Sequence, residues 1–290
     1  MKRLKVTVGI LAHNEETNIN QALASVVKAK LVEIEVEKIV IVSSGSFDAT
    51  NKLVRRWGRR DKRIKLLMQS RREGKAAAIN FFIRQARSPI LVTMSADIKL
   101  APMALEELCL PFWDIGVGMV GAHPVPVDRP GGQLNREIAL LWQLHHEISL
   151  IKPKCGEMVA FRNIIRNMPE DSAVDEATLE VLLTLLGYNV VYAPRAIVYN
   201  RGVKTYWEFM KQRRRVQTGH EWVRDRYHYR VATVMPGLLL KVVLNHLGHR
   251  PQDTLVMVKL LSWELVARAL GFIDYYVWQK NPYTWPMVAR

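Results

Sequence analysis

Polar and charged residues follow four short apolar runs in the first hundred residues of this 290-residue chain. They form the motifs Ala12-His13-Asn14-Glu15, Ser43-Ser44-Gly45-Ser46-Phe47-Asp48, Gly74-Lys75 and Ser95-Ala96-Asp97. Amide, carboxylate and ammonium groups can bind a phosphate-bearing ligand, and a carboxylate such as that of Asp97 can hold a divalent cation that bridges a diphosphate. Each motif alone also fits an ordinary helix cap or turn. Their shared position directly after an apolar run is therefore the informative feature.

The segments that carry these motifs alternate between two hydrophobic periods. Four apolar runs are typical of buried strands: Leu4–Ala12, Val36–Ser43, Ile64–Gln69 and Ile90–Met94. Amphipathic segments of helical length lie between them: Glu15–Lys30, Asp48–Arg60 and Glu73–Arg87. This alternation predicts βαβ units and a mostly parallel sheet. Because such sheets bind ligands beyond the carboxyl ends of their strands, we expect the four motifs to meet at one edge.

The second half of the chain is less regular. The patterns predict strands at Gly116–Val127 and Cys155–Arg162, and helices at Ala101–Trp113, Gln133–Ile151, Asp175–Gly187 and Lys204–His220. Beyond Arg230 the sequence becomes more apolar. We therefore divide the chain into a catalytic domain, residues 1–230, and a C-terminal apolar and amphipathic helical region, residues 231–290.

Taken together and in order, the four motifs resemble those of glycosyltransferase family 2. The family patterns that they match are Pro-x-Asn-Glu, Asp-Asp-Gly-Ser-x-Asp, Gly-Lys-x-x-Ala-x-Asn (with Ala78 and Asn80) and Asp-x-Asp. The resemblance covers residues 4–222. These residues are similar to the catalytic domains of cellulose, hyaluronan and poly-N-acetylglucosamine synthases, which belong to this family. It implies an α/β fold of the GT-A type, with a Rossmann-like, mostly parallel sheet flanked by helices and a C-terminal helical extension. It also implies an inverting glycosyltransferase with a nucleotide-diphosphate sugar donor, expected to be a UDP-sugar.

The resemblance continues downstream and assigns roles to individual residues. Cys155–Arg162 is similar to the family's glycine-led strand near the donor sugar, Val174-Asp175-Glu176 to its acceptor-base segment, and Gln212–Val216 to its Gln-x-x-Arg-Trp motif. It implies that Asp175 or Glu176 is the general base, with Asp175 slightly preferred, and that Asp97 binds Mn²⁺ or Mg²⁺. The implied nucleotide contacts are Ala12, Asn14, Glu15, Ser43, Gly45, Lys75, Ser95, Ala96 and Arg215, and the implied donor or acceptor contacts are Gly156, Glu157, Gln212 and Arg213.

The chain also departs from the family pattern at three points. Ser43 and Ser44 replace paired aspartates, one of which contacts the nucleobase in the family, so the identity of the base stays open. Ser95 replaces the first aspartate of the metal motif, which leaves metal binding to Asp97. Val216 stands where processive members carry a tryptophan, and this argues against processivity. An inactive, transferase-shaped scaffold on a membrane is the alternative that these replacements keep open.

The composition is strongly basic, with 42 Lys and Arg against 27 Asp and Glu and a formal charge of +15. Such an excess favours anionic partners, which include nucleotide diphosphates, nucleic acid and anionic lipid, although solubility alone is a simpler explanation. The basic stretches contain no recognised nucleic-acid motif, so we expect no nucleic-acid partner, and a basic nucleic-acid-binding protein is the non-enzymatic alternative. Gly116, Gly118 and Gly121 match a dinucleotide fingerprint, but they enter a strand where the fingerprint needs a strand-to-helix turn.

The last sixty residues contain two apolar stretches, Val231–Leu247 and Leu255–Trp278. The second carries charges at positions 259, 264, 268 and 274, a spacing that favours an amphipathic helix lying in a membrane interface. Aromatic residues are expected near the headgroups, namely Trp263, Tyr275, Tyr276, Trp278, Tyr283 and Trp285. The alternative is that both stretches pack on the core or on a second subunit.

These features predict where the protein works. Only two cysteines occur, Cys109 and Cys155, which excludes a disulfide framework and fits a reducing cytoplasm. The first apolar run breaks at His13–Glu16, too early for a signal-peptide core, so no signal peptide is expected. We therefore expect peripheral attachment to the cytoplasmic face of an anionic membrane, and an acceptor that is a glycan or a lipid-linked molecule.

Overall fold

A computed structural model of the chain describes residues 3–127, 134–281 and 283. The strands are β1 (Leu4–Ala12), β2 (Ile34–Ser44), β3 (Ile64–Gln69), β4 (Ile90–Ser95), β5 (Lys99–Leu100), β6 (Val117–Pro126), β7 (Met158–Arg162) and β8 (Asn189–Asn200). The α-helices are α1 (Ile19–Val27), α2 (Thr50–Arg60), α3 (Lys75–Gln85), α4 (Ala104–Cys109), α5 (Asn135–Ile151), α6 (Asp175–Leu185), α7 (Tyr206–Tyr227), α8 (Pro236–His249) and α9 (Thr254–Tyr276). Short 3-10 helices are η1 (Leu110–Trp113), η2 (Ala232–Val234) and η3 (Pro251–Asp253).

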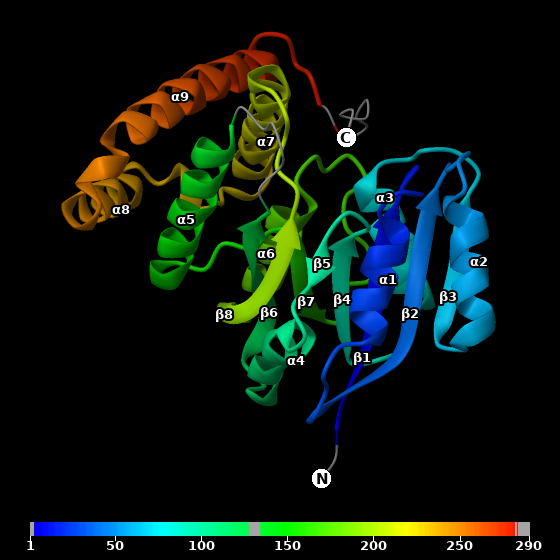
Figure 1. Cartoon of the computed structure of the whole chain (residues 1–290). Coiled ribbons are helices and arrows are strands. Elements are labelled where there is room, and N and C mark those ends of the chain that lie inside the picture. The colour runs from blue at the N-terminus through cyan, green and yellow to red at the C-terminus, as the bar shows by residue number, and fades with distance from the viewer. Residues whose placement is uncertain (1–2, 128–133, 282, 284–290) are drawn as a thin grey trace.

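Within the described residues the strands form one sheet in the order β3-β2-β1-β4-β7-β6-β8-β5 (Figure 1). The pairs β1–β2, β2–β3, β1–β4 and β6–β8 are parallel, whereas β7 runs antiparallel to both of its neighbours. The expected α/β architecture, with a mostly parallel sheet and helices on both sides, is confirmed.

The strand register brings the ends of the central strands to one edge of the sheet. Ala12 pairs with Ser43, Leu11 with Ser95, and Ser44 with Gln69. Because β7 is antiparallel to β4, it begins where β4 ends, and Met158 pairs with Met94. We call this edge, formed by the ends of β1–β4 and the start of β7, the strand-end rim.

Two apolar clusters hold helices against the two faces of the sheet. Alternate residues of one strand enter different clusters, because successive side chains of a strand point to opposite faces. Ile39 and Ile41 of β2 pack in the cluster that includes α1 and α4, whereas Val40 and Val42 pack in the cluster that includes α3 and α6. The helices that begin at the rim are thereby fixed relative to the strands that end there.

A third cluster joins the C-terminal helices to helices from earlier in the chain. Ile138 and Leu144 of α5, Phe209 of α7, Val242 of α8 and Leu260 of α9 all belong to it. We call α5, α7, α8 and α9 the helical unit; it lies to one side of the sheet in Figure 1. The α8 and α9 helices of the C-terminal region therefore pack on the rest of the chain. Among the described residues, none of the helices combines the length and the apolar character that crossing a membrane demands.

Local sequence explains where α7, one of the helices of the helical unit, begins. Thr205 is the N-cap of α7, and its hydroxyl accepts a hydrogen bond from the Glu208 backbone nitrogen at 3.2 Å. The Glu208 carboxylate in turn accepts one from the Thr205 nitrogen at 3.2 Å. This reciprocal capping satisfies amide groups that the first helical turn leaves without partners.

The structure differs from the sequence-based elements in the second half. The strand β8 was not predicted. It lies between β6 and β5 in the sheet and pairs with both. The predicted helix at Ala101–Trp113 is broken into α4 and η1, and the start of the predicted helix at residue 133 lies outside the described residues. Gly118 and Gly121 lie within β6, where an added Cβ would meet Tyr188 and Cys155, so these glycines serve close packing and not a dinucleotide.

Candidate functional site

Hydrogen bonds tie the loop after β1 to the loop after β2. The Asn14 nitrogen donates to Ser46 Oγ at 3.1 Å, and the Phe47 nitrogen donates to Asn14 Oδ1 at 3.0 Å. The Glu15 nitrogen donates to Thr50 Oγ1 at 2.8 Å. Asn14 adopts a positive φ of 53°, which asparagine tolerates better than most residues. The motifs that contain Asn14 and Glu15 are thus built into one surface with the Ser43–Asp48 loop.

Ser43 and Gly45 shape the loop after β2 that forms part of this surface. Ser43 is buried beside buried Ala12, and its hydroxyl donates to Ser46 Oγ at 2.9 Å. Gly45 has a φ of 63°, and a Cβ there would come within 2.7 Å of the Arg72 backbone nitrogen. Only glycine fits this close approach of the loops after β2 and β3. For both residues the structure shows a role in shaping the loop, while their contact with a nucleotide stays a prediction.

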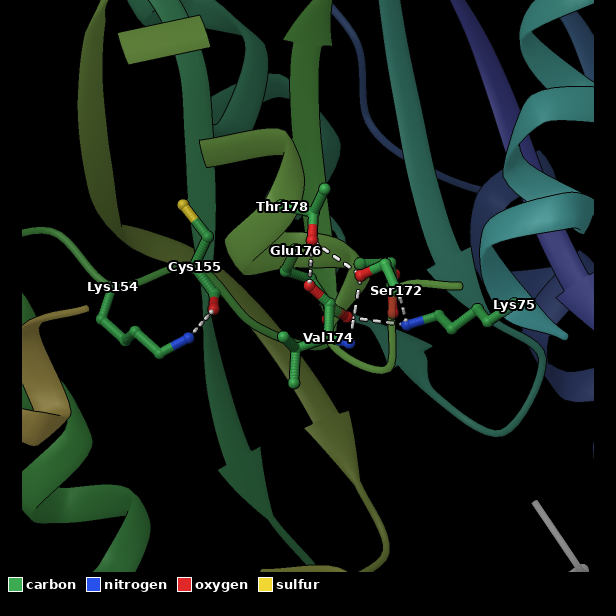
Figure 2. Close-up of polar contacts among 8 residues, drawn as sticks. Lys75, Lys154, Cys155, Ser172, Val174, Glu176 and Thr178 are labelled. Carbon is green, nitrogen blue, oxygen red and sulfur yellow. Dashed lines mark hydrogen bonds and ion pairs between the residues drawn. The ribbon is translucent and has the colours of Figure 1, made fainter. Parts of the chain in front are cut away.

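Lys75, the first residue of α3, lies between two acids from the far half of the chain. Its Nζ is 2.9 Å from Asp175 Oδ2 and 2.7 Å from Glu176 Oε1. Figure 2 shows the Lys75 side chain extended toward the N-terminus of α6, where Glu176 lies. The structure therefore brings together a predicted nucleotide contact and both base candidates, although they are a hundred residues apart in sequence.

A hydroxyl network fixes the turn that carries the two acids. Ser172 Oγ and Thr178 Oγ1 are 2.7 Å apart, and Thr178 Oγ1 donates to the Val174 carbonyl at 3.1 Å (Figure 2). The Val174 nitrogen donates to Ser172 Oγ at 3.3 Å. Because these bonds are buried, the start of α6 is rigidly placed and Asp175 and Glu176 have little freedom to move away from Lys75.

The two acids differ in their electrostatics. Burial and the negative charge of Glu176 raise the pKa of Asp175 to about 6. Burial would also raise the pKa of Glu176, but the charge of Lys75 outweighs it and holds that pKa well below its usual range. Burial would lower the pKa of Lys75, and the two acids instead raise it above its ordinary value. Asp175 is therefore the better proton acceptor near neutral pH, because its pKa lies closest to that pH.

A second pair of acids meets at the junction of β4 and β7. Burial and the charge of Asp97 raise the pKa of Glu157 to about 7, and Lys75 and Glu176 also influence it. Asn200, at the end of β8, donates to Glu157 Oε1 at 3.2 Å. Glu157 adopts a positive φ of 60°, an uncommon conformation for glutamate that is associated with functional sites. Asp97, Glu157, Lys75 and Glu176 thus form one electrostatic cluster.

The acids of this cluster suit a divalent cation whose ligands come partly from protein carboxylates and partly from a bound diphosphate. Hard divalent cations prefer carboxylate oxygens and often use one or two carboxylates together with substrate phosphates. Across residues 3–127, 134–281 and 283, no group of three or more His, Cys, Asp or Glu could hold a metal by itself. Asp97 and Glu157 therefore fit a divalent cation that also takes oxygen ligands from the phosphates of a bound substrate. Ser95 and Ala96 precede Asp97 at the end of β4, half-buried and buried respectively.

Two arginines of the run on α7 form ion pairs with acids on α9. Arg213 forms an ion pair with Glu264, and Arg214 forms one with Asp274, both on α9. The Arg213 guanidinium therefore contacts the helical unit, and its contact with a donor or acceptor stays a prediction. Gln212 and Arg215 lie on the same helix and are half-buried, and their roles stay predictions.

Sequence reasoning missed Asn200 and Lys154, which lie beside the cluster. Asn200 was missed because β8 was missed. Lys154 donates to the Cys155 carbonyl at 3.1 Å and contributes to lowering the pKa of Glu176 (Figure 2). The ring of His145 on α5 faces Gly156, since an added Cβ on Gly156 would lie 3.8 Å from His145 Nε2. Burial and the charge of Lys154 lower the pKa of His145 to about 3, so this ring is neutral. A basic residue directly before the glycine-led strand was the available signal for Lys154.

Comparison with known proteins adds an independent line of observation. The family model described as Glycosyl transferase family 2 matches residues 7–154. The chain is 27% identical over 243 residues to the probable glycosyltransferase YdaM of Bacillus subtilis (strain 168), which covers 77% of this chain and 57% of that protein. It is 27% identical over 118 residues to the glycosyltransferase AglE of Haloferax volcanii, which covers 41% of this chain and 38% of that protein. The chain thus spans less than two thirds of each of these relatives.

Solved structures share the fold at lower identity. The mannosyltransferase PcManGT from Pyrobaculum calidifontis, in complex with GDP-Man and Mn²⁺, has a TM-score of 0.70 at 19% identity and covers 97% of this chain and 89% of its own. Glucosyl-3-phosphoglycerate synthase from Mycobacterium tuberculosis, in complex with Mn²⁺, UDP and glucosyl-3-phosphoglycerate, has a TM-score of 0.53 at 18% identity and covers 77% and 80%.

Proposed function

Because this chain belongs to glycosyl transferase family 2 and is a glycosyltransferase, we propose that it moves a sugar from a nucleotide-diphosphate donor to a hydroxyl acceptor with inversion at the anomeric carbon. The contact of Lys75 with Asp175 and Glu176 carries this proposal. An acid with a raised pKa lies there beside a lysine whose charge suits a phosphate group. A direct displacement needs a base for the incoming hydroxyl and positive charge for the departing diphosphate.

In this scheme Asp175 accepts the proton of the acceptor hydroxyl. The hydroxyl oxygen forms a bond to the anomeric carbon while the bond between that carbon and the diphosphate oxygen breaks, and the electron pair leaves with the diphosphate. Attack opposite the leaving group inverts the configuration. Lys75 starts in contact with both acids and, once a donor binds, can turn its charge toward the diphosphate, which frees Asp175 to act as the base.

Asp97, with Glu157 beside it, would hold a divalent cation, Mn²⁺ or Mg²⁺. When bound, such a cation neutralises charge that develops on the departing diphosphate. The presence of Mn²⁺ in both solved structures named above supports this part of the proposal. Glu157 is held in place for such a role by the hydrogen bond from Asn200.

The donor and the acceptor are the open parts of the proposal. The family resemblance favours a UDP-sugar, while one solved relative carries GDP-Man and another carries UDP. The serines at positions 43 and 44 leave the nucleobase unassigned. We propose a glycan or lipid-linked acceptor close to a membrane, and the exposed apolar side chains of α9 support this choice.

A thermal-shift panel tests the donor and metal assignments. UDP- and GDP-sugars are tested with and without Mn²⁺ on the parent, on Asp97→Ala and on the exposed-acid control Glu35→Ala. We expect one donor to raise the unfolding temperature in a Mn²⁺-dependent manner in the parent and in Glu35→Ala, and not in Asp97→Ala. Full Mn²⁺-dependent stabilisation of Asp97→Ala would remove the metal assignment. Donor binding without any hydrolysis of the donor would instead identify an inactive scaffold.

A further inference from the structure

The charged residues of α9 point toward the protein. Lys259 Nζ is 2.6 Å from Glu137 Oε1 of α5, Glu264 pairs with Arg213 of α7, and Asp274 pairs with Arg214 of α7. Arg268 pairs with Glu264 and also donates to the Thr233 carbonyl. The charged side of α9 thus packs on the protein, whereas aromatic residues of this stretch were expected near lipid headgroups. Trp263, one of these aromatic residues, stacks on Tyr206 inside the helical unit at 5.1 Å; Trp285 lies outside the described residues.

The opposite side of α9 is exposed and apolar. Its large exposed side chains are Leu255, Val258, Leu261, Leu265, Val266, Phe272 and Tyr276. Leu255 is 84% exposed and Leu265 is 71% exposed. The remaining exposed residues of this helix are Thr254, Lys259, Ser262 and Ala269, and only Lys259 is charged. We call this surface the outer face of α9. A soluble helix normally has the reverse arrangement, with its polar side outward.

The outer face is broad and is bordered by cations. At about 100° per residue, Leu261 and Val266 lie about 140° apart around the helix axis, which is wider than the narrow seam of a paired helix. At the N-terminal end of α9, the neighbouring helix α8 exposes Leu240 and Leu244 with Lys241 between them, and Arg250 is exposed after α8. At the other end, exposed Trp278 is followed by exposed Lys280. Broad apolar surface with aromatic and cationic residues at its borders suits a lipid interface.

From these observations we infer that the outer face of α9 docks on an anionic lipid bilayer, with the helix lying in the plane of the interface and its apolar side chains among the acyl chains. A second copy of the chain is the other occupant to consider. The overall charge of +15 disfavours it, because two such chains repel each other whereas an anionic surface attracts them.

The placement of α9 relative to the rim fits this inference. Figure 1 shows α9 along the outer edge of the molecule, on the side toward which β2 points, and the end of β2 is part of the strand-end rim. A bilayer against α9 would therefore lie on the same side as the candidate site, which is where a lipid-linked acceptor would be presented. The docking itself depends only on the fold and holds whether or not the proposed donor chemistry is right.

Flotation with lipid vesicles tests the inference directly. The full chain is mixed with vesicles of phosphatidylcholine and phosphatidylglycerol in equal parts, or with vesicles of phosphatidylcholine alone. We expect flotation with the mixed vesicles, and a loss of about tenfold or more in bound fraction for Leu255→Asp/Leu265→Asp, because each charge would have to enter the interface. The matched control is Val32→Asp/Ile115→Asp, whose parent side chains are 66% and 84% exposed and lie far from α9 in sequence.

The outcomes separate the alternatives. Equal flotation of the α9 variant and the control variant overturns the inference, and so does a parent chain that fails to float. A parent that fails to float but is a dimer in solution, and becomes a monomer in the α9 variant, assigns the outer face to a second copy. Donor-induced thermal stabilisation, measured on the same samples, reports separately on the proposed function.

A site-specific probe gives a second readout that does not depend on a charged substitution. Cys109 and Cys155 are both buried, so a cysteine at position 265 is the accessible site for a polarity-sensitive fluorophore. We expect a blue shift on addition of mixed vesicles for Leu265→Cys and none for the control Ile115→Cys. Identical responses at the two positions contradict docking through α9.

Discussion

Charged side chains are arranged in opposite ways in the strand-end rim and in the helical unit. At the rim, Asp97, Glu157, Asp175 and Glu176 gather near one lysine, and the pKa values of Glu157 and Asp175 are raised by burial and by neighbouring acids. In the helical unit, Glu264 and Asp274 are also buried, but ion pairs with arginines keep their pKa values below the usual range against the effect of burial.

This difference separates charges that serve chemistry from charges that serve packing. Like charges held together in a buried place oppose folding, so a fold that retains them does so for a ligand or a reaction. Opposite charges with matched partners fix the position of α9 on α7. We therefore expect substitutions at the rim to reduce activity without reducing stability, and substitutions in the helical unit to have the reverse effect.

The largest effect is expected at the rim. Asp175→Asn removes the base, and we expect donor turnover to fall by about a thousandfold. At pH 8 the ionised Asp175 opposes folding, because its pKa in the folded chain lies above its ordinary value, so the free energy of unfolding should stay the same or rise. Turnover and urea unfolding measured on one preparation check both parts. A larger loss of turnover for Glu176→Gln would reverse the assignment of the base.

The next effect is expected in the helical unit. Glu264→Gln leaves Arg213 and Arg268 without their buried partner, which should lower the free energy of unfolding by about 3 kcal/mol. Donor turnover per folded molecule should be unchanged at a temperature well below the unfolding midpoint. Urea unfolding measures the change, with exposed Glu35→Gln as a control that should shift it by less than about 0.5 kcal/mol. A large loss of turnover without a loss of stability would contradict the view that the charges of the helical unit serve packing.

The pH dependence of activity sharpens the assignment within the rim. Asp175 must be ionised to accept a proton, and its pKa is raised to about 6. With Mn²⁺ in excess, so that occupancy of the Asp97 and Glu157 site does not vary with pH, we expect kcat/KM for the donor to be constant above this pH and to fall about tenfold for each pH unit below it. If Glu176 were the base, its lowered pKa would move this fall to a far more acidic pH. A profile that stays flat down to pH 5 would therefore exclude Asp175.

The smallest expected effect is a shift of that same profile. Lys75→Gln removes the cation that favours the ionised forms of Asp175 and Glu176. The acid limb of the pH profile should then move upward by about one unit, since an opposite charge at contact distance lowers a carboxyl pKa by one to three units. Measurement of kcat/KM between pH 5 and pH 9 detects this shift. An unmoved limb would mean that Lys75 and the base are not coupled.

The sequence predicted the first half of the fold because β1, β2 and β4 are buried on both faces over most of their length. Such strands form continuous apolar runs, and β1 agrees with its predicted bounds at both ends. The strand β8 carries Pro194 and Arg195 in its middle, so it lacks both a continuous apolar run and a regular alternation. Its existence follows from pairing with β6, which is a property of the assembled sheet.

The site was predictable where residues lie next to strand ends, and not where partners come from elsewhere. The register of parallel strands explains why Asn14, Ser43 and Asp97 gather at one edge. The contact of Lys75 with Asp175 and Glu176 depends on how α6 packs on the sheet, which local patterns do not encode. The orientation of α9 could not be predicted for the same reason. The spacing of its charges shows that the helix has a charged side, but not whether that side faces the protein or the outside.

The stereochemistry of donor cleavage tests the central claim most directly. The chain is incubated with an α-linked sugar nucleotide and Mn²⁺, with water or an added hydroxyl compound as the acceptor, and the first-formed product is observed by proton NMR before anomers equilibrate. Our account predicts the β anomer as the initial product, with its formation lost in Asp175→Asn. Initial formation of the α anomer, or an unchanged rate in Asp175→Asn, would contradict a direct displacement assisted by Asp175 at the strand-end rim.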